Sequence, residues 1–153
     1  MLTRPDGSTY SFPDVTVSCT PPRVDGGDPL GSGPGRIWLW SPIHLVGTGD
    51  DARVTEPFVY LEAIVDEIAG DRTFTWPNDW SMDTEHVPLT LFVADSEGRP
   101  RSNETSTNEA AARGTVHVLE AACDPEPVLR LEVDATLGSE VGQGTLHVGG
   151  AAG

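Results

Sequence analysis

Lysine is absent from this sequence of 153 residues, and all nine of its basic residues are arginines. They are opposed by 24 aspartates and glutamates, so the formal net charge is -15 at pH 7. A surface with this charge repels phosphate backbones and anionic lipids, which argues against nucleic acids and membrane surfaces as partners. It favours metal cations and basic partners instead. The lack of lysine, beside abundant Gly, Ala, Pro, Arg, Asp and Val, is typical of a GC-rich genome or of a salt-adapted proteome.

Long apolar runs are missing as well. No apolar stretch reaches the roughly 18 residues that a membrane-spanning helix needs, so we expect no membrane span. The opening residues MLTRPDGSTY also lack the basic region and apolar core of a signal peptide. Two localisations are therefore left open: the cytoplasm, or an extracellular or cell-surface site with a signal or anchor that is not in the given chain. The length predicts a single domain, residues 1–153.

Cysteine is scarce, with Cys19 and Cys123 only, and there is no C-x-x-C spacing that would indicate a redox motif or a thiolate zinc site. Cys19 follows Val15 and Val17 on one face of a strand pattern, and Cys123 ends the segment GTVHVLEAAC, so both can point into one core. We predict a disulfide between them. In the chain-entropy model a bridge closing a loop of about a hundred residues stabilises a fold by roughly 4 to 5 kcal/mol. The alternative is a pair of unpaired thiols that act as small core residues.

What the sequence does have is alternation of apolar and polar residues, the pattern of half-buried strands. It is clearest over residues 127–137, where Leu129, Leu131, Val133, Ala135 and Leu137 alternate with Arg130, Glu132, Asp134 and Thr136. Further strands are predicted at 114–123, 145–150, 14–19 and 88–95, and the last three along the chain form a meander. We expect an all-β, antiparallel β-sandwich, immunoglobulin-like or similar, of about seven or eight strands. Two polar segments, 21–35 and 96–113, are expected to be long loops.

Residues 55–70, TEPFVYLEAIVDEIAG, fit two patterns. Helical spacing of Phe58, Leu61, Val65 and Ile68 favours a helix that Gly70 would end. The same segment alternates as a strand, and a turn at Gly70 before RTFTW would suit a hairpin. Because the surrounding elements are predicted strands, we expect a strand here, with a short helix near residues 56–69 as the alternative.

The segment RIWLW places Trp38 and Trp40 on one side of a predicted strand and Ile37 and Leu39 on the other, so both sides are apolar. Either this strand is buried on both faces, or the tryptophans form a platform on which a sugar ring or a partner protein stacks. A sandwich of this size can bury two or three indoles, and we expect core packing. The candidate ligand-binding residues, if the platform exists, are Trp38, Trp40, Trp76 and Trp80.

Oxygen-bearing side chains occur at every second position of NDWSMDTEH, namely Asp79, Ser81, Asp83 and Glu85. This spacing resembles the first ligands of a calcium loop, although an EF-hand needs Gly and Glu where this chain has Thr84 and Thr90. The segment is therefore either a solvated acidic loop or a weak Ca²⁺ site, and we expect no other cofactor. Two of its carboxylates could instead form the acid/base pair of a glycoside hydrolase.

The opening DGSTYSF and the closing segment RGTVHVLEAACDPEPVLRLEVDATLGSEVGQGTLHVGG together resemble the poorly characterised bacterial exported or lipoprotein-type β-sandwich domains. The resemblance covers about the last forty residues most closely. It implies a fold and an extracellular or cell-surface location, with no activity attached.

We therefore expect a non-enzymatic, exported or surface module with a binding or structural role. Its partner would be a protein or a carbohydrate. Two alternatives are kept: a carbohydrate-binding domain with a weak calcium site, and a hydrolase that uses the carboxylates of residues 79–85.

Overall fold

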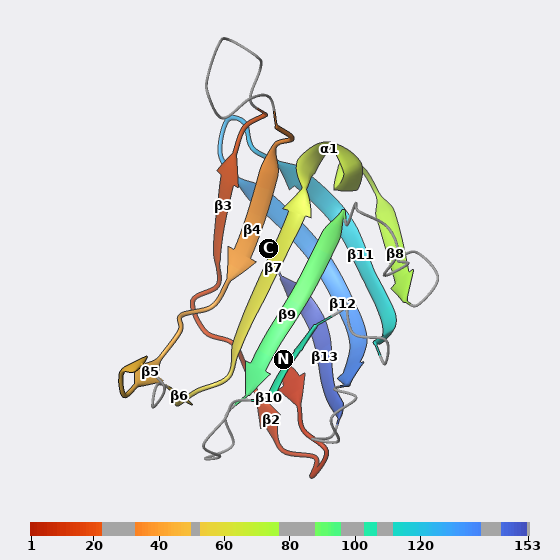
Figure 1. Cartoon of the computed structure of the whole chain (residues 1–153). Coiled ribbons are helices and arrows are strands. Elements are labelled where there is room, and N and C mark those ends of the chain that lie inside the picture. The colour runs from red at the N-terminus through yellow and green to blue at the C-terminus, as the bar shows by residue number, and fades with distance from the viewer. Residues whose placement is uncertain are drawn as a thin grey trace.

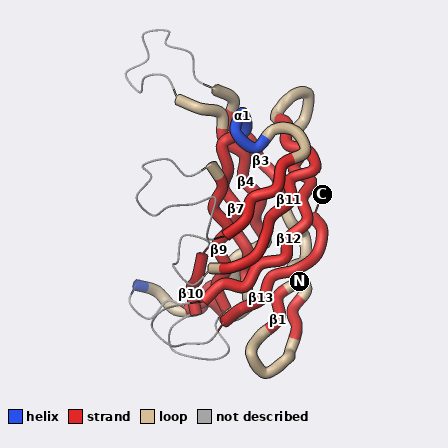
Figure 2. The backbone as a smooth tube through the Cα atoms, turned by 90° about the vertical axis from the view of Figure 1, so that its right-hand side faces the viewer, coloured by secondary structure: helices blue, strands red, loops and turns tan. Residues whose placement is uncertain are grey.

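The computed structural model describes residues 1–22, 33–49, 53–76, 88–95, 103–106, 112–138 and 145–152. Within these ranges the chain forms thirteen strands and one short helix. Two antiparallel sheets face each other, as Figure 1 shows from the front and Figure 2 from the side. The predicted antiparallel β-sandwich is confirmed.

The six-stranded sheet contains both ends of the described chain. Its order is β2 (Thr9–Tyr10), β1 (Leu2–Thr3), β13 (Thr145–Ala152), β12 (Val128–Gly138), β11 (Arg113–Ala122) and β8 (Arg72–Trp76). The predicted meander is confirmed, because β12 pairs with β11 on one side and with β13 on the other. The inward side chains of β12 are those that the alternation in the sequence predicted, such as Leu129 and Leu137.

The second sheet has five strands, in the order β10 (Asn103–Ser106), β9 (Leu89–Asp95), β7 (Phe58–Ile64), β4 (Arg36–Trp40) and β3 (Thr16–Thr20). A separate ribbon, β5 (Leu45–Val46) with β6 (Arg53–Val54), extends from one end of the sandwich (Figure 1).

The described strands outnumber the seven or eight expected for two physical reasons. Four of them, β1, β2, β5 and β6, are two residues long, and a strand that short shows no alternation in a sequence. β10 lies inside the expected loop 96–113, which corrects that expectation. Its residues Asn103–Ser106 are all polar, so they carry no apolar alternation and are held by backbone pairing with β9.

The ambiguous segment 55–70 begins as the expected strand and ends as a helix. Val59, Leu61 and Ala63 are buried in β7, after which α1 (Val65–Ile68) makes a single helical turn. Ile68 is fully buried, so the turn closes one end of the core. Gly70 follows with φ 86°, a conformation that glycine adopts without a steric cost, and the chain reverses into β8.

The core lies between the two sheets and is built from the inward positions of the long strands. The predicted disulfide between Cys19 and Cys123 is confirmed, with the two Cα atoms 5.6 Å apart and a sequence separation of 104. Cys19 is in the edge strand β3 and Cys123 follows β11, so the bridge joins one sheet to the other. Such a bridge is consistent with an oxidising environment.

Candidate functional site

Trp38 and Trp40 lie on the outer face of the five-stranded sheet. Ile37 and Leu39, which alternate with them in β4, are 0% and 4% exposed and belong to the core, whereas the two indoles are half-buried on the opposite side. The expectation of core packing is therefore wrong for Trp38 and Trp40, because the aliphatic residues of this strand already occupy the inward positions. It is right for Trp76, which is 4% exposed and packs in the core.

A row of aromatic side chains crosses three neighbouring strands of this outer face. Trp40 of β4 is paired with Tyr60 of β7, and Tyr60 is paired with Phe92 of β9. Residues paired in this way have Cβ atoms about 5 Å apart on the same side of a sheet. Phe58 lies diagonally from Phe92, with their ring centroids 5.7 Å apart and the rings tilted by 39°. Figure 1 shows the three strands side by side.

We call the outward-facing residues Trp38, Trp40, Phe58, Tyr60 and Phe92 the aromatic face. Each is half-buried, so its ring packs against its neighbours while part of it contacts solvent. Three of the five, Phe58, Tyr60 and Phe92, were missed by the sequence analysis. Their signal was present in the alternation itself, since each occupies a position where a solvent-facing strand normally carries a polar residue.

Hydrogen-bonding groups lie among these rings. Glu62 is paired with Trp38 across the sheet, accepts a hydrogen bond from the Tyr60 hydroxyl at 3.2 Å, and forms an ion pair with Arg36. On the other side of β4, Thr16 is paired with Trp40 and Ser18 with Trp38. The face therefore combines flat apolar surfaces with hydroxyl, carboxylate and guanidinium groups.

The charged residues beside the aromatic face are paired with each other. Among the outward residues of β3, β4, β7 and β9, the charged ones are Arg36 and Glu62, which are paired with each other. Burial raises the pKa of the Tyr60 phenol, and the nearby charge of Glu62 and its hydrogen bond raise it further, against the opposing effects of Trp38 and Arg36. Tyr60 is therefore a neutral hydroxyl at physiological pH, available as a donor and an acceptor.

The outer face of the six-stranded sheet has a different composition. His117 Nε2 lies 2.5 Å from Asp71 Oδ1, and its Nδ1 lies 3.7 Å from Glu132 Oε2. The hydrogen bond to Asp71 is the main reason why the pKa of His117 is raised above its ordinary value. His147 lies 3.8 Å from Asp134 on the same surface. The described residues hold no group of three or more His, Cys, Asp or Glu side chains placed to bind a metal ion.

The predicted calcium ligands Asp79, Ser81, Asp83 and Glu85, and with them Trp80, lie outside the described residues. The calcium site and the carboxylate pair of the hydrolase alternative therefore stay predictions.

No family model matches this chain, and no curated protein or solved structure matches it either. The resemblance to exported bacterial β-sandwich domains accordingly stays a prediction. Over the part of the chain that is described, no helix has the length and apolarity to cross a membrane.

Proposed function

We propose that this domain is a non-enzymatic binding module that takes a neutral glycan on the aromatic face. The observation that carries the proposal is the row Trp40, Tyr60 and Phe92, which exposes aromatic surface across three adjacent strands. Outward positions add nothing to the core between the sheets, so core packing gives no reason for large rings there.

Carbohydrate fits this mixture of groups better than a purely apolar partner does. A pyranose ring has an apolar C–H face that stacks on aromatic rings, and hydroxyls around its edge that need hydrogen-bond partners. The aromatic face offers the rings beside Thr16, Ser18, Tyr60 and Glu62. Three strands spaced by about 4.8 Å make the row about 10 Å long from the first strand to the third. This is longer than one sugar ring, so the occupant is an oligosaccharide or a polysaccharide chain.

The charge of the protein selects among glycans. The whole chain carries a formal charge of -15, and Arg36 and Glu62, the charged outward residues of β3, β4, β7 and β9, are paired with each other. Polyuronates and sulfated glycans would approach against this field, whereas a neutral glycan would not. We therefore assign neutral glycans as the ligand class.

The disulfide supports an extracellular or cell-surface location, where glycans of this kind are met. Structural disulfides persist in oxidising compartments and are rare in reducing ones. The Cys19–Cys123 bridge joins the two sheets, so it belongs to the architecture of the fold. Its formation in cells is tested by alkylating free thiols in a lysate prepared without reductant. Unalkylated Cys19 and Cys123 are expected.

The binding proposal is tested with neutral hexasaccharides of glucose, xylose, mannose and N-acetylglucosamine, with polygalacturonate as the anionic comparison. Binding is followed by isothermal titration and by tryptophan fluorescence. At least one neutral glycan is expected to bind and polygalacturonate is not. Trp40→Ala and Tyr60→Ala should each weaken binding about tenfold, since a lost stacking ring is worth about 1.4 kcal/mol, and His147→Ala on the other sheet should not change it.

Failure of all four neutral glycans to bind, or equal loss in His147→Ala, would contradict the proposal. The same titrations with Ca²⁺ and with a chelator test the weak calcium site of residues 79–85. Reducing ends appearing in the samples over time would instead support the hydrolase alternative.

A further inference from the structure

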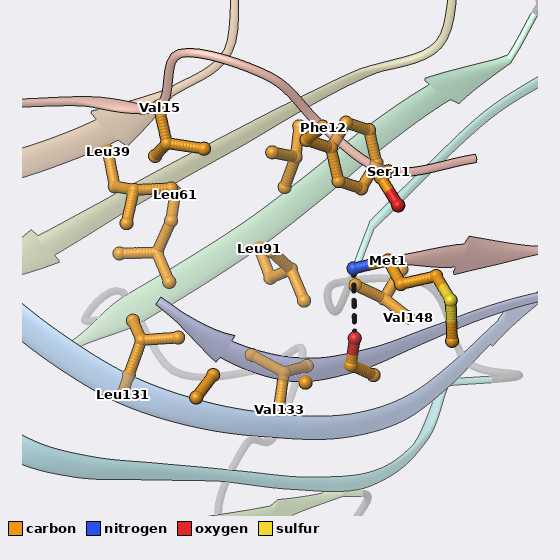
Figure 3. Close-up of a pocket in the computed structure, with 14 residues that line it drawn as sticks. Met1, Ser11, Phe12, Val15, Leu39, Leu61, Leu91, Leu131, Val133 and Val148 are labelled. Carbon is orange, nitrogen blue, oxygen red and sulfur yellow. Dashed lines mark hydrogen bonds between the residues drawn. The ribbon is translucent and has the colours of Figure 1, made fainter. Parts of the chain in front are cut away.

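A cavity of about 160 Å³ lies between the two sheets, separate from the aromatic face. Leu39, Leu61 and Leu91 line it from the five-stranded sheet, and Leu131, Val133 and Val148 line it from the six-stranded sheet. Figure 3 shows these side chains pointing toward one another, with Phe12 and Val15 above them. Because Leu39 and Leu61 point inward, the cavity lies on the opposite side of the sheet from Trp40 and Tyr60.

The sequence of β13 accounts for the hollow. Its inward residues Leu146 and Val148 are paired with Leu137 and Ala135 of β12, and the next position in the same alternation, paired with Val133, is Gly150. Gly150 has φ +118°, and a Cβ atom added there would meet nothing closer than the Met1 nitrogen at 3.9 Å. The strand therefore loses side-chain volume where the two sheets would otherwise fill the space.

The cavity opens to the surface at this end. Val15, 39% exposed, lines it together with the exposed Gly150 and Ala151. Its lining includes one side-chain hydroxyl, that of Ser11, and no charged side chain. The Met1 amino group already donates to the Gly149 carbonyl at 2.9 Å. A water molecule needs two to four polar partners in a buried site, whereas every lining side chain other than that of Ser11 is apolar.

We propose that this cavity binds a small apolar molecule the size of a benzene ring or a short alkyl chain. An enclosed space of about 150 Å³ lined by Leu, Ile and Phe stays dry and takes benzene. This cavity has a similar volume and is also lined mainly by apolar side chains, and it differs in being open to the surface at one end. The ligand enters between the segment 11–15 and the end of β13. Its recognition rests on shape and burial of apolar surface, with no fixed polar contact.

The test is thermal unfolding in buffer saturated with benzene, compared with buffer alone. A rise in Tm of about 2–4 °C is expected, the shift that a ligand at a few times its Kd produces in a chain of this length. Methyl resonances of Leu61, Leu91 and Val148 should move on addition of benzene. n-Hexane and 1-dodecanol are run in parallel. A rise in Tm with n-hexane but not with 1-dodecanol indicates a free hydrocarbon ligand. A rise in Tm with both compounds indicates that the opening of the cavity admits the alkyl chain of a lipid.

Val133→Phe fills the cavity and should abolish both the rise in Tm and the movement of the methyl resonances. Val15→Phe blocks the mouth from a more exposed position and serves if Val133→Phe does not fold. Leu119→Phe is the matched control, because Leu119 is 39% exposed and does not line the cavity. Trp40→Ala should also keep the response, which separates this site from the aromatic face. An unchanged Tm with unmoved methyl resonances in the natural chain, or a response that persists in Val133→Phe and Val15→Phe, would overturn the proposal.

Discussion

The two outer faces of this sandwich follow the same alternation and carry opposite kinds of residue. On β12 the outward positions hold Arg130, Glu132 and Asp134, and all three are exposed. On β4 and β7 the corresponding positions hold two tryptophans, a tyrosine and a phenylalanine beside the paired Arg36 and Glu62. An outward strand position is free of the demands of the core, so its content reflects what the surface meets. The polar face meets water, and the aromatic face has the composition of a surface that meets a ligand.

The largest expected effect concerns the link that holds both sheets together. Replacing both cysteines, Cys19→Ala with Cys123→Ala, should lower the free energy of unfolding by about 3–5 kcal/mol, because the unfolded chain regains the freedom of a loop of about a hundred residues. Urea unfolding followed by fluorescence measures this loss. Both outer faces should survive in the variant at low temperature, so its affinity for the glycan that binds the natural chain should be unchanged. A parallel loss of affinity would show that the aromatic face depends on the bridge.

The next largest effect separates the inner and outer sides of a single strand. Leu61→Ala removes a fully buried side chain and should cost about 2–5 kcal/mol of stability. Tyr60→Thr, at the adjacent outward position, should cost about 1 kcal/mol, because threonine keeps a high strand propensity and the lost ring is only half-buried.

Glycan affinity should show the reverse order. It should fall in Tyr60→Thr and stay close to that of the natural chain in Leu61→Ala, provided that both are compared well below their melting temperatures. A Tyr60→Thr variant that is destabilised as strongly as Leu61→Ala would place Tyr60 among the core residues and contradict the distinction between the faces.

Alternation made the inner side of this fold predictable, and its outer side much less so. The inward residues of β9 and β12, such as Leu91 and Leu131, were identified because burial leaves a strict two-residue period in the sequence. The same period gave the pairing of Cys19 with Cys123. Trp38 and Trp40 were placed in the core instead, because hydrophobicity alone does not say which side of a doubly apolar strand faces inward.

The aromatic row on the outer face depends on the register between strands that are distant in the sequence. Trp40 meets Tyr60 and Phe92 only when β4, β7 and β9 are aligned, and no pattern within one strand states that alignment. The cavity depends likewise on the pairing of Gly150 with Val133. Sites that form from pairs of strands are therefore the part of this molecule that sequence reasoning misses.

The smallest expected effect is a difference in pH dependence between the two faces. The pKa of His117 is raised by its hydrogen bond to Asp71, with smaller contributions from the charges of Asp71 and Glu132. Protonated His117 therefore stabilises the folded state fully below its unfolded pKa of about 6.5, and this contribution is lost as the pH rises through the folded pKa. Tyr60 of the aromatic face does not titrate near neutral pH, since its pKa is raised from 10.0.

Urea unfolding at pH 6 and pH 8 should accordingly show a larger loss of stability on going to pH 8 in the natural chain than in Asp71→Asn, which removes the acceptor carboxylate. The other histidines contribute equally to both proteins, so the difference isolates His117. Glycan affinity should be the same at the two pH values, because the pKa of Tyr60 is raised from 10.0 and its phenol stays neutral at both. A glycan affinity that falls between pH 6 and pH 8 would mean that the histidine-bearing face takes part in binding, and the division of roles between the two sheets would be wrong.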